Sequence, residues 1–251
     1  MSRSIRARRT LLALALLVTA HGPVAADDAP SHAARWRYRE GRGIQLTLPD
    51  PGLRLRLSGL AQFDAAWSDT DARSIDDHFE VRRGRLALRG RLGRAWGFGA
   101  EADFSGPDPL LVEAFLRYGR IAGGRLTAGY IKEPIGLEWQ SSSRSAIFME
   151  RSLASVFLPP YHVGARMNWS GRRWSVAAGA FGGGIYGEDP TDGDWSLSTR
   201  ATFAPLHRRR QVVHLGLGGS WRQREGNRAR LRLEPRPEVH LVEALADTGV
   251  V

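Results

Sequence analysis

Basic side chains are the residues of this chain that could do chemistry. All but Lys132 of its 36 lysines and arginines are arginine, and in several segments arginine recurs at every second position. A guanidinium binds phosphate or carboxylate oxygens through paired hydrogen bonds and keeps its charge at physiological pH. Anion-selective pores use rings or ladders of such groups. These residue types therefore predict anion binding, provided that one kind of element turns them to the same side.

The stretch 79–104 indicates which element that is. Read at every second residue, it separates into two faces, with a break at residues 93–95. The apolar face holds Leu86, Leu88, Gly90, Leu92, Trp96, Phe98, Ala100, Ala102 and Phe104. The charged face holds Arg83, Arg85, Arg89, Arg91, Glu101 and Asp103. Alternation on both sides of a short break predicts a β-hairpin.

A second run, Arg228, Arg230 and Arg232, alternates with small or apolar residues. An arginine facing lipid near the middle of a membrane would cost about 2–4 kcal/mol. A soluble β-sandwich also alternates, but its polar face meets bulk water and rarely needs arginine at nearly every position. We therefore expect an all-β fold, a transmembrane antiparallel β-barrel with apolar and aromatic residues toward lipid and arginines toward a wet interior.

The N-terminus has the features of an export signal. Basic residues precede an apolar core at 11–18, and small residues at 24–26 form a cleavage site, so residues 1–26 are predicted to be a signal peptide. Residues 27–52 are polar and contain Pro and Gly, and we interpret them as a mobile periplasmic lead-in. The net charge of +10 could suggest nucleic acid, but an exported protein does not normally meet any.

Several chemistries have no support in the sequence. Cysteine is absent, which excludes a disulfide scaffold or a thiol-based site. No apolar run after the leader reaches the ~18 residues of a spanning helix. The zinc-type His pair, the calcium-loop spacing and the Gly-x-Ser-x-Gly elbow are all missing. We expect no metal and no cofactor.

Ten strands are predicted after the lead-in. They are Leu53–Trp67, Phe79–Leu92, Trp96–Phe104, Leu111–Tyr118, Gly124–Ile131, Tyr161–Trp169, Trp174–Phe181, Trp195–Phe203, Val212–Trp221 and Arg228–Leu233. Long and short connections alternate between them, as in outer-membrane barrels with short periplasmic turns. Aromatic residues fall at or near the strand ends, as interfacial girdles would.

The longest connection, residues 132–160, contains apolar residues among serines and arginines. A long apolar loop is not expected to extend into water. We predict that it folds back into the lumen and narrows it; the alternative is an extra helix on the surface.

Six segments together resemble the phosphate-selective porin family of outer-membrane channels. They are Phe79–Leu86, Glu101–Phe104, Leu126–Pro134, Ser142–Arg144, Phe148–Leu153 and Arg230–Glu238. The resemblance covers nearly everything from Leu53 to the C-terminus. It implies a homotrimer of sixteen-stranded barrels in outer-membrane lipid that pass inorganic phosphate or polyphosphate by diffusion. An interior of that size leaves an aqueous channel.

The resemblance also implies an anion site. The matching positions are Arg82, Arg83, Lys132 and Arg144 around a constriction, with Asp103 as an acidic position nearby. A row leading to the constriction corresponds to Arg228, Arg230, Arg232 and Arg236.

The strand count departs from the family. Ten strands occupy residues 53–236, which leaves too few residues for six more before Val251. A sheet with open edges is not viable in lipid. The barrel domain, 53–251, is therefore expected to be incomplete at its C-terminus, the alternative being closure with fewer strands.

Two other functions remain open at this stage. One is a lipase-like hydrolase built on an outer-membrane barrel, for which His162, Ser175 and Asp189 could be combined. The other is a non-conducting structural barrel, whose interior should be filled by balanced salt bridges. We expect a channel and not an enzyme, because the arginine-rich tenth strand has no evident acidic partners.

Overall fold

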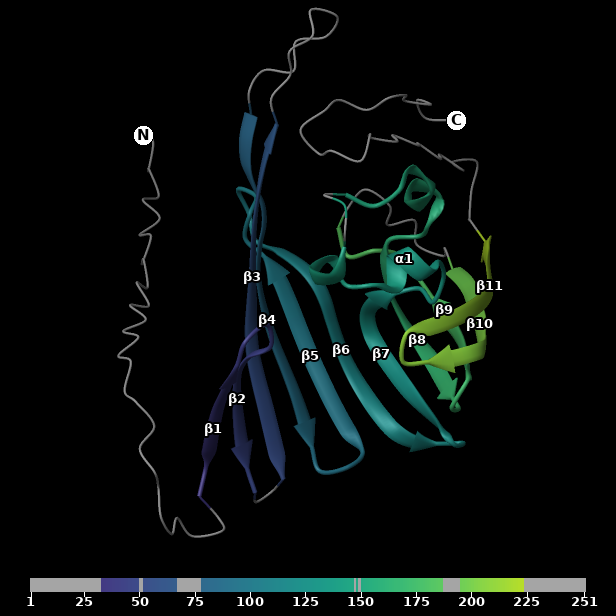
Figure 1. Cartoon of the computed structure of the whole chain (residues 1–251), viewed down its shortest axis with the longest axis horizontal. Coiled ribbons are helices and arrows are strands. Elements are labelled where there is room, and N and C mark those ends of the chain that lie inside the picture. The colour runs from purple at the N-terminus through teal and green to yellow at the C-terminus, as the bar shows by residue number, and fades with distance from the viewer. Residues whose placement is uncertain are drawn as a thin grey trace, which may run out of the picture.

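The computed structural model of the chain describes residues 33–49, 52–66, 78–146, 148, 150–186 and 195–223. Its strands form one antiparallel sheet in which every strand pairs with its neighbours in sequence, from β1 to β11. The sheet is curved, and its short helical segments lie on the concave side (Figure 1). This is the all-β, porin-type architecture that the alternation predicts.

The strands are β1 Arg35–Arg39, β2 Gly43–Leu48, β3 Leu53–Ala66, β4 His78–Leu92, β5 Trp96–Asp103, β6 Leu110–Ile121, β7 Gly124–Lys132, β8 Tyr161–Ser170, β9 Trp174–Phe181, β10 Trp195–Arg208 and β11 Gln211–Gln223. The helical segments are α1 Leu137–Gln140, η1 Ser143–Ser145 and η2 Leu153–Phe157. Nine of the ten predicted strands are thereby confirmed, with ends shifted by a few residues. The tenth, Arg228–Leu233, lies outside the described residues, as does the predicted signal peptide.

The N-terminal hairpin β1–β2 was not predicted. It lies within the predicted periplasmic lead-in, 27–52, and joins the sheet, because Arg35 pairs with Thr47 and Leu48 pairs with Leu53 of β3. A tight turn joins the two strands, and Gly41 and Gly43 have positive φ angles of 65° and 80°. A Cβ on Gly43 would lie 2.1 Å from the carbonyl oxygen of Leu57, so the close approach of β2 to β3 at this point requires glycine.

The two ends of the sheet differ. At one end, here called the short-turn end, the connections are brief: 93–95 after β4, 122–123 after β6, 171–173 after β8 and 209–210 after β10. At the other, the loop end, the connections are longer and include residues 133–160. The predicted alternation is therefore confirmed for the described part of the chain. The last short turn is tighter than expected because β10 continues to Arg208.

The outward face has no protein covering it. Leu86, Leu116 and Leu217 are 53%, 53% and 81% exposed, and Leu86 lies on the face predicted to be apolar. The described residues include only four buried hydrophobic side chains, Ala87, Ile131, Phe181 and Ala204. A soluble sandwich would bury such a face against a second sheet. Within the described residues, no helix is long and apolar enough to cross a membrane.

The long connection 133–160 lies over the concave face. Its Arg144 donates to the carbonyl of Gly59 on β3 at 2.7 Å, and its Gln140 accepts from Arg166 on β8 at 3.4 Å. The segment therefore contacts strands on both sides of the concavity. Figure 1 shows α1 on the concave side of the sheet. The prediction of an inward fold is confirmed, and the surface-helix alternative is not.

Candidate functional site

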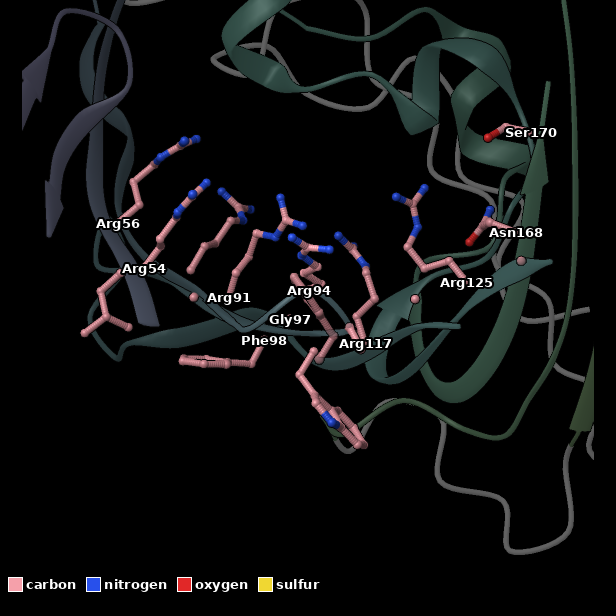
Figure 2. A pocket seen from close by; sticks show the side chains of 18 of the residues that line it. Arg54, Arg56, Arg91, Arg94, Gly97, Phe98, Arg117, Arg125, Asn168 and Ser170 are labelled. Atoms are coloured by element: carbon pink, nitrogen blue, oxygen red, sulfur yellow. The ribbon is translucent and has the colours of Figure 1, made fainter. Parts of the chain in front are cut away.

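A groove of about 630 Å³ lies on the concave face toward the short-turn end. Its basic lining residues are Arg54, Arg56, Arg89, Arg91, Arg94, Arg117 and Arg125. No aspartate or glutamate is among the residues that line it. Figure 2 shows six of these arginines, all except Arg89, directed into the same space, with Phe98 on the opposite side of the sheet.

Strand register brings these arginines together. Arg54 pairs with Arg91, Arg91 with Gly97, and Gly97 with Arg117, so one row crosses β3, β4, β5 and β6. The row continues through Thr127 on β7 to Arg166 on β8. Residues directly opposite in an antiparallel sheet point to the same face. A single shared register therefore concentrates charge from strands far apart in sequence.

Gly99 makes room within this array. A Cβ at Gly99 would lie 2.8 Å from ring carbons of Phe115 and 3.1 Å from Cγ of Arg89. The Phe115 ring therefore lies flat over β5, and the Arg117 guanidinium lies over that ring at 4.6 Å from its centroid. This cation–π contact fixes the direction of one groove arginine without neutralising it.

Most groove arginines carry uncompensated charge. Only Arg89 takes part in a described ion pair, with Glu101 at 3.0 Å and with Glu113. Arg117 donates to the neutral hydroxyl of Thr127 at 3.3 Å. The other described ion pairs do not involve any groove arginine. The groove can therefore offer guanidinium groups to a mobile anion.

A second, smaller cavity of about 200 Å³ lies between the sheet and the connection 133–160. It is lined by the basic residues Arg85, Arg89, Arg117, Lys132, Arg151 and Arg166, by the acids Glu101 and Glu113, and by Ser141, Ser142 and Ser143. Arg89, Phe115 and Arg117 line both cavities and form the junction between them. Hydroxyls and cations at close quarters suit an oxyanion.

Lys132 is the one predicted site residue that lines this smaller cavity. Its Nζ donates to the carbonyl of Trp139 at 2.7 Å and lies 5.0 Å from the Trp139 ring and 5.3 Å from the Tyr161 ring. Arg151 lies over the same indole at 4.6 Å. Trp139 therefore contacts two of the cations that line the cavity.

Arg82 and Arg83 are consecutive, yet both reach the concave face. Gln62 pairs with Arg83 while Phe63 pairs with Val81, so Arg82 is the extra residue of a β-bulge. Both arginines bind Glu150 of the long connection, Arg83 at 3.1 Å. A bulge cancels the change of face that consecutive strand residues normally show.

The remaining predicted residues have separate partners. Asp103 accepts from Arg85 at 2.7 Å and from the backbone N–H of Gly84 at 3.1 Å. Arg144 is exposed and donates to the carbonyl of Gly59, near the point where β2 begins beside β3. Neither Arg82, Arg83, Asp103 nor Arg144 lines either cavity described above. Arg228, Arg230, Arg232 and Arg236 lie outside the described residues.

Sequence reasoning missed the groove as a site. The alternating arginines of β3 and β4 were visible in the sequence, namely Arg54, Arg56, Arg89 and Arg91. Nothing in the sequence indicated that their side chains line one groove. Arg117 and Arg125 do not alternate with other arginines on their strands, and the available signal was which face of the strand each occupies relative to the outward aromatic residues. The face of each arginine locates it relative to the others only when the registers of neighbouring strands are known.

Glu133 anchors the start of the long connection. Its carboxylate has no exposed surface and is bonded by His162 Nδ1 at 2.8 Å, by Ser196 at 3.1 Å, and by Ser198 and Arg222. Burial acts to raise the pKa of Glu133, but hydrogen bonds from His162 and Ser198 and the charge of Arg222 outweigh it and lower that pKa to about 2. The carboxylate is therefore ionised and ties β7 to β8, β10 and β11.

Fold and site together define a curved membrane-type sheet with an arginine-lined interior. Residues 55–249 match the family described as phosphate-selective porin O and P, and the chain belongs to this family. The sequence resemblance is thus confirmed. Membership in a porin family implies an outer-membrane location and a channel instead of an enzyme.

One curated relative is an uncharacterized protein of Caulobacter vibrioides (strain ATCC 19089 / CIP 103742 / CB 15). It is 27% identical over 200 residues, which cover 74% of this chain and 40% of that protein. The chain thus spans well under two thirds of the length of this relative.

Proposed function

We propose that this chain forms the wall of an outer-membrane channel that passes anions by diffusion, with phosphate or polyphosphate as preferred solutes. The groove carries the proposal. It gathers seven arginines from four strands and one turn, and no acidic residue lines it. A low-dielectric wall with one sign of charge concentrates counter-ions near it. The assembled form, by family resemblance, is a homotrimer.

Arginine supports phosphate over chloride for a geometric reason. Each guanidinium presents two parallel N–H groups that match two oxygens of one phosphate, whereas a spherical ion gains nothing from the fork. Passage also requires several sites of moderate strength instead of one tight trap. The row from Arg54 through Arg91 to Arg117 provides such a series.

The hydrolase alternative receives no support from the residues that the structure describes. His162 is engaged at both ring nitrogens, by Glu133 at 2.8 Å and by Arg222 at 3.3 Å. Ser175 is bonded to Thr202 at 2.6 Å, and Asp189 lies outside the described residues. Ser175 and His162 therefore bind other residues and do not form the serine–histidine contact on which such catalysis depends.

A non-conducting barrel would balance its interior charges throughout. Toward the loop end the charges do pair, for example Arg85 with Asp103 and Arg89 with Glu101. The groove toward the short-turn end has no such balance. This difference favours conduction.

The test is reversal-potential measurement with the full chain in planar bilayers under a potassium chloride gradient. We expect chloride selectivity, and we expect Arg91→Gln with Arg117→Gln to lower the chloride-to-potassium permeability ratio by roughly tenfold, the lower range of electrostatic focusing. Arg39→Gln with Arg42→Gln removes the same charge near the β1–β2 turn, outside the groove lining, and serves as the matched control.

Added phosphate should then reduce the chloride current in the unmodified channel by competing for the arginines. Cation preference, or the absence of any channel, would contradict the proposal as a whole. An undiminished chloride current in phosphate would contradict only the phosphate preference.

A further inference from the structure

Arginines also collect on two neighbouring short turns, apart from the groove. The basic rim comprises Arg172, Arg173, Arg208, Arg209 and Arg210, all exposed. Arg172 and Arg173 lie between β8 and β9, and the others lie where β10 turns into β11. The first turn adjoins β10, because Ala204 N–H donates to the carbonyl of Arg173 at 2.7 Å and Arg173 donates to that of Pro205 at 3.4 Å. From there β10 continues to Arg208 and the second turn.

The basic rim is not neutralised within the described chain. None of its arginines takes part in a described ion pair. No acidic residue occurs in the described short turns, that is, in residues 93–95, 122–123, 171–173 and 209–210. Five exposed charges along this edge of the sheet, none of them in a described ion pair, attract counter-ions.

An aromatic band lies just inside this rim on the outward face. Trp96 packs against Tyr118 with tilted rings whose centroids are 4.7 Å apart, and Trp174 pairs with Phe203 across β9 and β10. Trp169 donates its indole N–H to the carbonyl of Ala122 in the neighbouring turn at 3.1 Å. Trp and Tyr of membrane proteins lie at the level of the lipid headgroups.

The band therefore locates the membrane interface, and the rim lies beyond the band toward the short-turn end. Arg173 directly precedes Trp174, and Arg208 follows Phe203 by five residues, about 17 Å along an extended strand. We propose that the basic rim binds the phosphate groups of anionic phospholipids in the leaflet that the short turns meet. The rim faces lipid headgroups at the outer edge of the sheet, whereas the groove faces the permeating solute, so the two bind different anions.

The test uses the full chain in vesicles of brominated phosphatidylglycerol or brominated phosphatidylcholine, with tryptophan quenching as the measure of relative lipid binding. We expect preference for phosphatidylglycerol at low salt, weakened at high salt because exposed charges are screened. Arg209→Gln with Arg210→Gln should lower this preference by at least about threefold, since each basic residue near an anionic surface contributes measurably.

Arg39→Gln with Arg42→Gln is the matched control, a pair of the same charge by another hairpin turn, and should leave the lipid preference unchanged. Arg209→Lys with Arg210→Lys keeps the charge and should retain the preference, which separates lipid binding from a folding defect. Equal quenching by both lipids in the unmodified protein, or an equal loss in the control, would overturn the proposal. The readout needs no conduction, so the two proposals can fail separately.

Discussion

At the scale of single residues, the partner of each arginine decides what that arginine can do. Arg82, Arg83 and Arg85 bind carboxylates, whereas Arg54, Arg91 and the other unpaired groove arginines have no described ion pair. A paired guanidinium positions the connection 133–160 or holds a strand in place. An unpaired one remains available to a solute. Under the proposed function, the same residue type serves structure toward the loop end and anion binding toward the short-turn end.

Replacing Glu150 tests this distinction. Glu150→Gln keeps the size of the side chain but removes the charge that Arg82 and Arg83 share. We expect the chloride-to-potassium permeability ratio to rise about two- to tenfold, because two more cations then face the lumen. Reversal potentials measure the change. Glu138→Gln is the control in the same loop, since Glu138 accepts hydrogen bonds from Ser152 and takes part in no described ion pair with an arginine. An equal rise in both variants would contradict the role assigned to Glu150.

Gly99 allows a second test at this scale. Gly99→Ala would place a methyl group 2.8 Å from the Phe115 ring and 3.1 Å from Arg89. The ring must move, and Arg117 loses the surface over which it lies. We expect destabilisation of about 1–3 kcal/mol from overpacking and a reduced anion selectivity. Denaturant unfolding followed by circular dichroism measures the first effect. Gly219→Ala, where an added Cβ meets no atom within 4 Å, is the control.

At the scale of elements, the long connection depends on its anchor at Glu133. Lys132 precedes this buried carboxylate, so the position of Lys132 at the cavity follows from the network with His162 and Arg222. The connection is thereby fixed at one end to β8, β10 and β11. At Glu150 and Arg144 it is fixed to β4 and β3. A loop held at both sides is suited to define a constriction.

Glu133→Gln should release this anchor. Removing one partner of a buried pair leaves the other without compensation, at a cost of roughly 3 kcal/mol. We expect a lower denaturant midpoint and faster proteolysis within residues 137–157. Unchanged proteolysis would show that the remaining contacts suffice to hold the connection.

The same carboxylate predicts a pH dependence. Its pKa of about 2 in the folded protein lies below its ordinary value of 4.5, so the stability that it contributes is fully present above about pH 4.5 and is lost as the pH falls through about 2. The denaturant midpoint of the unmodified protein should fall across that window more than that of Glu133→Gln. Parallel profiles for the two proteins would contradict the assignment.

At the scale of the whole molecule, charge is segregated along the strands. The described acids of the concave face, such as Glu101, Asp103 and Glu113, lie toward the loop end, and the acid-free groove lies toward the short-turn end. In the proposed channel, a solute crosses one region of paired charges and one region of unpaired positive charge. This asymmetry belongs to the sheet and to no single residue.

Segregated charge predicts rectification. At roughly 0.1 M salt the screening length is about 10 Å, and the groove should make the current larger at one sign of voltage than at the other. At roughly 1 M salt, where that length is about 3 Å, the asymmetry should largely vanish. Single-channel current–voltage curves at both concentrations measure it. The Arg91→Gln, Arg117→Gln double variant should rectify less; symmetric curves at low salt would contradict the prediction.

The sequence by itself determined which residues form strands and which face each residue takes. Alternation at period two is a local property, so Arg85, Arg89 and Arg91 could be separated from Leu86 and its neighbours without any tertiary information. The alternation did not reveal β1 and β2, because two short strands gave a weak signal. It also assigned no face correctly at Arg82, where a bulge interrupts the alternation.

The tertiary structure decided which arginines meet and which are neutralised. The row from Arg54 to Arg117 depends on the register of β3 through β6, and the pairing of Arg83 with Glu150 joins residues 67 positions apart. Register and loop placement are set by contacts between distant segments, and a one-residue slip would turn every side chain of a strand to the other face. Local periodicity contains no information about those contacts, so the groove could be found only in the folded chain.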